Sequence, residues 1–180
     1  MSEVQEAQAP AGSWSIDKVH STVRFEVEHN SASTYRGSFS DIDASLDYGD
    51  DGAQIKGSVK VDSISIEDEQ LRGHILSAEF FDAERYPTLD FVSKEFAVEN
   101  GELVVSGDLT VRGETNPVTV RGTIGEPFTN LAGSTSIAVR LSTQIDRTQY
   151  GLDWQMQLPN GNEVLGNDVN VEVELELVQG

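Results

Sequence analysis

Apolar and polar residues alternate along almost the whole of this 180-residue chain. The clearest example is residues 171–177, which read Val-Glu-Val-Glu-Leu-Glu-Leu. Because successive side chains of a strand point to opposite faces, this two-residue period is typical of antiparallel strands with one buried and one solvated face. Eight such stretches occur, at residues 19–29, 42–48, 55–61, 89–96, 103–111, 118–124, 137–145 and 169–177.

Sequences that favour turns separate these stretches at regular intervals, as in Glu99-Asn-Gly101. Many short strands at even spacing predict a sandwich or a barrel. Gly57, Gly107 and Gly122 lie inside strand patterns and suit the bends that closing a barrel requires. With the acidic side chains of 171–177 outside, we predict an all-β, water-soluble, eight-stranded antiparallel barrel that holds its own side chains or one small ligand.

Residues 71–92 interrupt the alternation and gather aromatic side chains beside a histidine and two arginines. Phe80, Phe81, Tyr86 and Phe91 all lie in this segment. Large apolar rings outside a strand must cover apolar surface, and in a β-protein that surface is usually the mouth of a sheet or barrel. We therefore expect a short helical lid near residues 68–82 over an apolar cavity. Alternatively, Phe80 and Phe81 plug one end of the barrel as part of its core.

The chain carries 31 acidic and 12 basic side chains, for a formal net charge of −19. Such a surface repels nucleic acid and anionic membranes, so neither is an expected partner. Self-repulsion on this scale destabilises a fold at low ionic strength. Two interpretations stay open: an ordinary acidic soluble protein, or a halophilic protein adapted to high salt. No stretch approaches eighteen consecutive apolar residues, so we expect no membrane span.

Residues 1–12 are expected to form a flexible tail, and residues 13–180 a single domain. The first residues lack the basic region and apolar core of a secretory signal, which predicts a cytoplasmic location. A signal removed beforehand would instead place the protein in the periplasm or outside the cell. The absence of cysteine excludes disulfides, thiol catalysis and thiolate metal sites.

Motifs that carry chemistry are absent: the sequence has no phosphate-binding glycine loop, metalloprotease helix or nucleophile elbow. His20 and His29 are nine residues apart, so an unbroken strand would point them to opposite faces. With no spacing typical of metal ligands, we expect neither a metal site nor a cofactor. The alternative is a barrel enzyme, or a metal-dependent site, that uses His29 and His74 on a small molecule.

Several motifs together resemble the YceI-like family of polyisoprenoid-binding proteins, over roughly residues 13–178. The two most specific are Phe80-Phe-Asp82 followed by Tyr86-Pro87, and Gly107-Asp-Leu-Thr-Val-Arg-Gly113. The remaining matches are Trp14-Ser-Ile-Asp17 with His20-Ser21 and His29, Gly37-Ser-Phe39, His74, Ser77-Ala-Glu79, Phe91-Val-Ser93, Pro117-Val118 and Arg147 to Gly151.

The resemblance implies an extended, lipocalin-like barrel around a long isoprenoid chain that is a quinone, a quinone precursor or a polyprenyl phosphate. It implies a carrier or storage protein without enzymatic activity, in several members a homodimer, and in many an exported protein. A filled barrel with a structural or stress-related role remains a further alternative. The side chains expected to contact the ligand are Val23, Phe25, Val27, His29, Phe39, Leu46, His74, Phe80, Phe81, Leu89, Phe91, Val105, Leu109, Val139 and Leu141.

Overall fold

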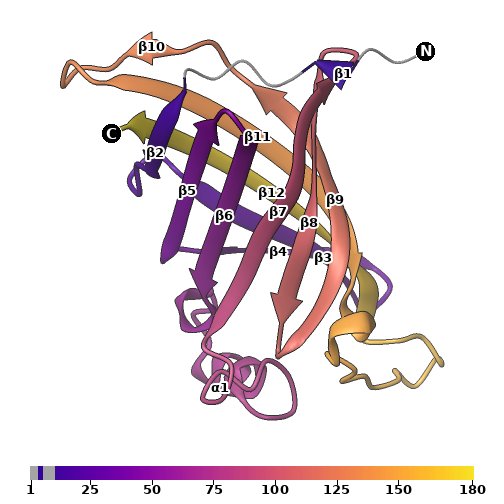
Figure 1. Cartoon of the computed structure of the whole chain (residues 1–180). Coiled ribbons are helices and arrows are strands. Elements are labelled where there is room, and N and C mark those ends of the chain that lie inside the picture. The colour runs from indigo at the N-terminus through magenta and orange to yellow at the C-terminus, as the bar shows by residue number, and fades with distance from the viewer. Residues whose placement is uncertain (1–3, 6–10) are drawn as a thin grey trace.

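The computed structural model describes residues 4–5 and 11–180, and antiparallel strands make up most of it (Figure 1). The predicted all-β fold is confirmed. The helical elements of these residues are α1 (Glu69–Leu76) and two 3-10 turns, η1 (Val61–Ser63) and η2 (Arg147–Tyr150). The strands are β1 (Val4–Gln5), β2 (Gly12–Ile16), β3 (Thr22–His29), β4 (Ser33–Phe39), β5 (Ile42–Gly49), β6 (Gly52–Lys60), β7 (Thr88–Glu99), β8 (Glu102–Val111), β9 (Glu114–Ile124), β10 (Phe128–Thr129), β11 (Thr135–Asp146) and β12 (Leu165–Gln179).

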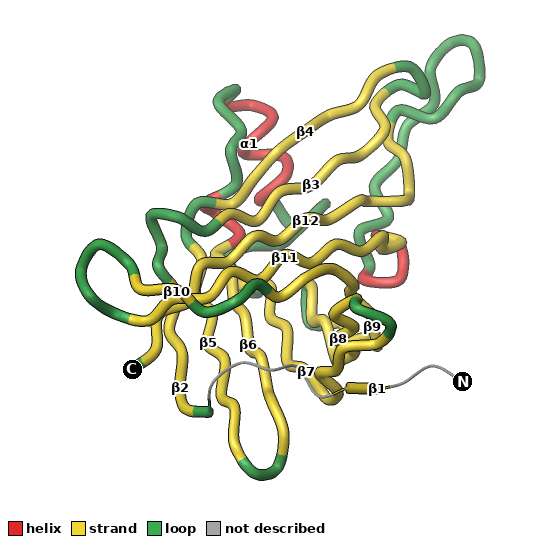
Figure 2. The backbone as a smooth tube through the Cα atoms, turned by 90° about the horizontal axis from the view of Figure 1, so that it is seen from above, coloured by secondary structure: helices red, strands yellow, loops and turns green. Residues whose placement is uncertain are grey.

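Eight of these strands close into an antiparallel barrel, in the order β2, β5, β6, β7, β8, β9, β11 and β12. The last of them, β12, completes the ring because it pairs with β11 on one side and with β2 on the other. Figure 2 shows β12 running beside β11, with β3 and β4 continuing the sheet on its other side. The predicted eight-stranded antiparallel barrel is therefore confirmed.

The strands β2 and β3 share one side of β12 at different heights. β2 pairs with residues 177–179, whereas β3 pairs with residues 165–174. The predicted strand at residues 19–29 is thus β3, which lies beside the closed ring rather than in it. The sequence pattern missed β2 because it holds only two large apolar residues, and it missed β4 because Gly37 interrupts the alternation there.

Two glycines let neighbouring strands approach closely enough to close the ring. A Cβ on Gly122 in β9 would lie 1.7 Å from the carbonyl oxygen of Arg140 in β11. A Cβ on Gly107 in β8 would lie 2.2 Å from the carbonyl oxygen of Val92 in β7. Since no side chain tolerates such distances, only glycine fits at these two positions. Gly57 has no such contact, because its Cβ would meet its nearest neighbour only at 3.9 Å.

Side chains fill the end of the barrel that β2 closes. Trp14, Leu46, Val105, Val139 and Leu177 are each no more than 1% exposed and belong to one packed cluster. We call this region the filled end. The opposite end is covered from outside, by α1 and the residues around η1 and η2 (Figure 1).

The short helix expected near residues 68–82 is present as α1. Asp68 caps it, since its carboxylate accepts a hydrogen bond from the backbone N–H of Leu71 at 2.8 Å. The loop that follows folds back onto the helix, because the N–H of Phe81 donates to the carbonyl of Ile75 at 3.0 Å. We call residues 68–87, which comprise the cap, α1 and this loop, the lid.

Most of the predicted tail, residues 1–3 and 6–10, lies outside the described residues. Val4–Gln5 form β1 and pair with β7, and β2 begins at Gly12. Within residues 4–5 and 11–180, none of the helices is both long and apolar enough to cross a bilayer.

Candidate functional site

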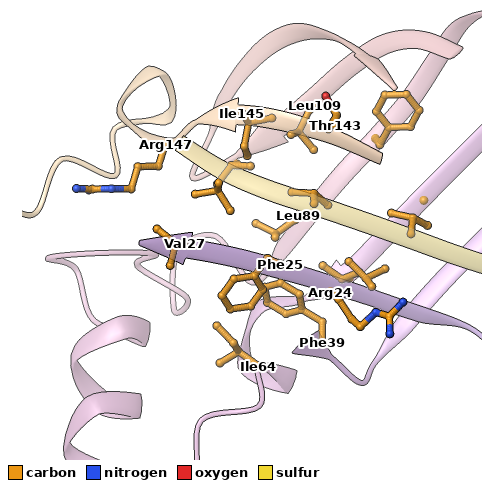
Figure 3. A pocket seen from close by; sticks show the side chains of 18 of the residues that line it. Arg24, Phe25, Val27, Phe39, Ile64, Leu89, Leu109, Thr143, Ile145 and Arg147 are labelled. Carbon is orange, nitrogen blue, oxygen red and sulfur yellow. The ribbon is translucent and has the colours of Figure 1, made fainter. Parts of the chain in front are cut away.

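A cavity of about 520 Å³ lies between the filled end and the lid, enclosed by strands of the barrel together with β3 and β4. Its wall is made by strands β3 to β9, β11 and β12, and residues of the lid cover one end of it. Figure 3 shows apolar side chains from these strands converging on the space, among them Phe25, Leu89 and Ile145. A cavity of this size lies within the range of small-molecule binding sites.

The inward side chains of β12 show where the barrel stops being filled. Leu175 and Leu177 are 4% and 0% exposed, as expected of core residues. Val169, Val171 and Val173 point to the same face but are only half-buried, and they line the cavity. Their outward neighbours are polar or acidic, so the accessible surface of these valines faces the interior. The barrel therefore has a hollow half, and a barrel filled throughout by its own side chains does not describe this protein.

Eleven of the fifteen residues predicted to contact a ligand line the cavity. They come from β3, β4, the lid, β7, β8 and β11. The eleven are Val23, Phe25, Val27, His29, Phe39, Phe80, Phe81, Leu89, Phe91, Leu109 and Leu141.

The other four predicted residues lie elsewhere. Leu46, Val105 and Val139 point inward as expected, but they are packed in the filled end. Alternation in the sequence gives the face on which a side chain lies and not its height in the barrel. His74, in α1, does not border the cavity; its Nε2 lies 3.0 Å from an oxygen of Glu79, and its ring packs at a steep angle against that of Trp154.

Sequence reasoning missed a large part of the cavity wall. The inward valines of β12 and β9 carried the same two-residue signal as the residues that were chosen. Residues around η1 and in α1 carried no strand signal and could be placed only by the fold. The missed apolar residues are Ile42, Ala44, Ile55, Val59, Ile64, Ile66, Leu71, Ile75, Val111, Val118, Val120, Ile145, Leu152, Leu165, Val169, Val171, Val173 and Leu175.

An aromatic group forms the side of the cavity next to β4. The ring of Phe25 lies 5.6 Å from that of Phe39 and 6.1 Å from that of Tyr35, measured between centroids. The far edge of the Phe25 ring lies over Gly37, where a Cβ would come within 2.4 Å of its Cζ atom. The glycine that interrupts β4 thus makes room for a ring in the cavity wall.

Eight of the residues that line the cavity are themselves exposed, and His29, Ser33 and Leu71 are three of them. His29 ends β3, Ser33 begins β4, and Leu71 lies in the first turn of α1, where it is 43% exposed. We call the region formed by His29, Ser33 and Leu71 the mouth. It combines one apolar side chain with polar groups that can donate or accept hydrogen bonds.

Arg147, at the start of η2, is 2% exposed and also borders the cavity. Its guanidinium donates to the backbone carbonyls of Gly166, Leu152, Trp154 and Leu165 and to the side-chain oxygen of Asn167. These five bonds use all five of its N–H donors. In Figure 3 the side chain points away from the apolar residues of the cavity.

The environment of Arg147 affects its pKa in two opposing ways. Burial lowers the pKa, while the negative charges of Asp153, Asp146 and Glu163 raise it. Since the ordinary pKa of arginine lies far above neutral, the side chain keeps its positive charge at neutral pH. Its bonds tie the loop after η2 to the start of β12, which gives this buried cation a structural role.

Other polar groups of the wall are occupied or point outward. The hydroxyl of Thr143 in β11 donates to the carbonyl of Thr119 at 3.1 Å. Arg24 lies on the outward face of β3, where it pairs with Glu172 at 3.5 Å. His29 and His74 do not meet in the cavity, because only His29 borders it. The arrangement is therefore suited to enclosing an apolar molecule.

Comparison with known sequences gives a consistent set of relatives. The family model described as "YceI-like domain" matches residues 14–177. A UPF0312 protein of Staphylococcus epidermidis is 31% identical over 168 residues, which cover 91% of this chain and 95% of that protein. A UPF0312 protein of Staphylococcus aureus strain USA300 is 29% identical with the same coverage.

Comparison with solved structures supports the architecture. BcnA of Burkholderia cenocepacia superposes with a TM-score of 0.76 at 19% identity, over 89% of this chain and 98% of that one. The YCEI protein of Campylobacter jejuni gives a TM-score of 0.66 at 22% identity, over 80% and 84%. A polyisoprenoid binding domain from Saccharophagus degradans, implicated in plant cell wall breakdown, gives 0.67 at 12% identity, over 93% and 98%. At these identities the likeness shows a shared fold.

Proposed function

The chain belongs to the family of YceI-like domains, and from this premise we propose that it binds a long-chain polyisoprenoid lipid inside the barrel. The observation that carries the proposal is the apolar cavity that the protein's own side chains leave unfilled. A polyisoprenoid suits it because such a chain is apolar along its whole length and needs few polar contacts. The Saccharophagus degradans neighbour, described as a polyisoprenoid binding domain, supports the same ligand class.

Burial of the chain supplies the affinity. For a large ligand each non-hydrogen atom contributes ~0.3 kcal/mol, so a chain of about forty atoms reaches ~12 kcal/mol, which is nanomolar binding. The hydrocarbon lies against the half-buried valines of β12 and the aromatic group at Phe25. The head group lies at the mouth, where His29 and Ser33 offer hydrogen bonds.

We assign an uncharged head group, such as that of a quinone or its precursor, in preference to a polyprenyl phosphate. A phosphate needs free N–H donors or a cation, and the donors of Arg147 are all engaged. Arg24 and Lys56 lie at outward positions of their strands. The net charge of −19 further disfavours an anion at the mouth.

The role that fits this site is that of a carrier or store, with no chemical step on the lipid. An acid–base mechanism would need a pair of titratable groups within hydrogen-bond reach of one substrate atom. The two histidines considered for such a pair lie in different surroundings, His29 at the mouth and His74 against Glu79.

The test is mass spectrometry of a solvent extract of the purified protein, beside native mass spectrometry of the intact protein. We expect one polyprenyl lipid per chain, with a neutral head group. Val171→Trp, which fills the cavity from β12, should abolish loading, whereas the same change at Val92, an exposed residue on the outside of β7, should leave it intact. A protein that is bare and takes up no added polyprenyl quinone would refute the proposal, and a bound polyprenyl phosphate would refute the head-group assignment.

A further inference from the structure

Residues 17–21, which connect β2 to β3, are hydrogen-bonded to the backbone of Glu176 in β12. The N–H of Asp17 donates to the carbonyl of Glu176 at 2.8 Å. The N–H of Glu176 donates in turn to the hydroxyl of Ser21 at 3.1 Å, and that hydroxyl donates to the carbonyl of Asp17 at 2.7 Å. The backbone therefore holds residues 17–21 in a fixed place beside the side chain of Glu176.

This placement brings together three side chains that can bind a metal ion. One oxygen of Asp17 lies 2.8 Å from Nδ1 of His20. The carboxylate of Glu176 completes the group, and the three ligand atoms all lie within 4.8 Å of one another. Donor atoms around a tetrahedral ion at ~2.1 Å are about 3.4 Å apart, so small side-chain rotations bring all three into range.

The accessibility of the group leaves room for the rest of a coordination shell. The side chain of His20 is 64% exposed and that of Asp17 is 27% exposed. Within residues 4–5 and 11–180, the carboxylate of Glu176 makes no hydrogen bond or ion pair with another side chain, so metal binding there breaks no existing contact of that carboxylate. Water can occupy the coordination positions that the protein leaves open.

We propose that Asp17, His20 and Glu176 form a binding site for one divalent transition-metal ion of the zinc type. Imidazole nitrogen with carboxylate oxygens suits Zn²⁺ and its neighbours better than Mg²⁺ or Ca²⁺, which take mainly oxygen ligands. Two carboxylates and a neutral histidine balance the charge of a dication. The net charge of −19 raises the local concentration of cations around the whole molecule.

The site is separate from the lipid cavity, because Glu176 points outward between the inward-facing Leu175 and Leu177. A bound ion would connect the turn between β2 and β3 to β12 through side chains, in addition to the backbone bonds. It would thus stabilise the barrel where β2 and β3 separate along β12. Success or failure of this proposal leaves the lipid proposal unaffected.

The matched control is the other histidine that pairs with a carboxylate. Nε2 of His74 lies 3.0 Å from an oxygen of Glu79, so this pair is about as close as Asp17 and His20. Among the described residues, only the group at Asp17, His20 and Glu176 brings three suitable donors together. Binding that depends on His20 and not on His74 therefore reports the three-donor site and not a general affinity of histidines for metals.

The experiment is a calorimetric titration of ZnCl₂ into the chelator-stripped full chain, in high NaCl to suppress diffuse cation binding. We expect one saturable equivalent, a higher Tm on saturation, and much weaker binding of Mg²⁺. His20→Gln and Glu176→Gln should each weaken Zn²⁺ binding by more than the roughly ten- to hundredfold that loss of an outer-shell partner costs, whereas His74→Gln should leave it unchanged. Unsaturable binding, or equal losses in His20→Gln and His74→Gln, would refute the site.

A second measurement needs no substitution and so does not depend on the folding of the variants. Histidine ring signals of the unmodified protein are followed by NMR while paramagnetic Ni²⁺ is added in small steps. We expect the signals of His20 to broaden first, well before those of His29 and His74. Broadening of all three together would overturn the proposal.

Discussion

Phe25 shows how one residue sets the shape of the cavity. Its ring borders the cavity between Tyr35 and Phe39 and keeps that position because the residue opposite it on β4, Gly37, has no side chain. A Cβ at Gly37 would come 2.4 Å from Cζ and 2.7 Å from Cε1 of the ring. Both atoms lie well inside van der Waals contact, so the ring must move when position 37 carries a methyl group.

We predict that Gly37→Ala displaces the ring of Phe25 into the cavity. The expected results are a loss of stability of about 1–3 kcal/mol from overpacking and weaker uptake of polyprenyl lipid. Urea unfolding and lipid extraction measure the two effects. Gly49→Ala in β5 is the control, because a Cβ there meets nothing within 4 Å. Equal behaviour of the two variants would contradict the role of Gly37.

Asp146, which caps η2, should make the free energy of unfolding depend on pH. Its carboxylate accepts hydrogen bonds from the hydroxyl and the N–H of Thr148, at 2.6 and 2.9 Å, and caps η2. These bonds lower the pKa of Asp146 from its ordinary 3.8, with a smaller contribution from the charge of Arg147. A group whose pKa is lower in the folded state contributes stability above its unfolded pKa, and that contribution is lost as the pH falls through the folded pKa.

We therefore predict that Asp146→Ala lowers the Tm at neutral pH and that its difference from the parent protein shrinks below pH about 4. Thermal unfolding of both proteins across the acid range measures this difference. Asp50→Ala, in the exposed turn after β5, controls for the loss of one negative charge. A difference that stays constant down to the lowest pH would show that the carboxylate form is not what stabilises η2.

At the scale of elements, α1 is the helix with the least support from the core. It spans eight residues and none of them is fully buried. Isolated helices of that length are marginal in water, so the cap at Asp68 and the contacts of Ile75 and Leu76 with the covered end sustain it. Such an element opens locally at lower cost than the strands beneath it.

We predict that Asp68→Ala opens the lid without unfolding the barrel. Loss of the cap costs about 1 kcal/mol, which corresponds to roughly fivefold faster hydrogen exchange of the α1 amides. Release of bound lipid should accelerate by a similar factor. Glu67→Ala, one residue earlier and exposed, is the matched control. Faster exchange throughout the barrel would contradict a local effect.

The elements also show what the sequence can reveal. Residues 169–177 alternate without a break, and β12 is the strand predicted there. β2 was missed because a five-residue strand around Trp14 is too short to display a period. For the cavity, alternation correctly placed Val105 and Val139 on the inward face. Whether such a residue borders the cavity or packs in the filled end depends on its height along the barrel axis, and these two pack in the filled end. That information resides in strand register, which a single sequence expresses only weakly.

At the scale of the whole molecule, charge should govern stability. Outward carboxylates on β12 pair with arginines of the adjoining strands, Arg24 with Glu172 at 3.5 Å and Arg140 with Glu174 at 3.4 Å. Exposed pairs of this kind contribute little individually. With 31 acidic against 12 basic side chains, most of the negative charge has no cation to offset it.

We predict that the Tm rises when NaCl is increased from about 10 mM to about 1 M, because the Debye length falls from ~30 Å to ~3 Å and repulsion is screened. Thermal unfolding in NaCl measures the effect, and a neutral solute at matched osmolality separates screening from a general solute effect. A Tm that is flat or falls with salt would contradict the prediction and remove the basis for a halophilic interpretation.

The pairing of β2 with β12 has a consequence for biosynthesis. Residues 14–16 pair with residues 177–179, so β2, the first strand of the ring, cannot form this pairing until β12 has been synthesised. The hairpins from β5 to β9 can form while the ribosome is still adding residues, but they remain an open, curved sheet until β12 has emerged. The enclosed space therefore arises only after β12 has been synthesised and has left the ribosome, and a lipid can be enclosed only from that point on.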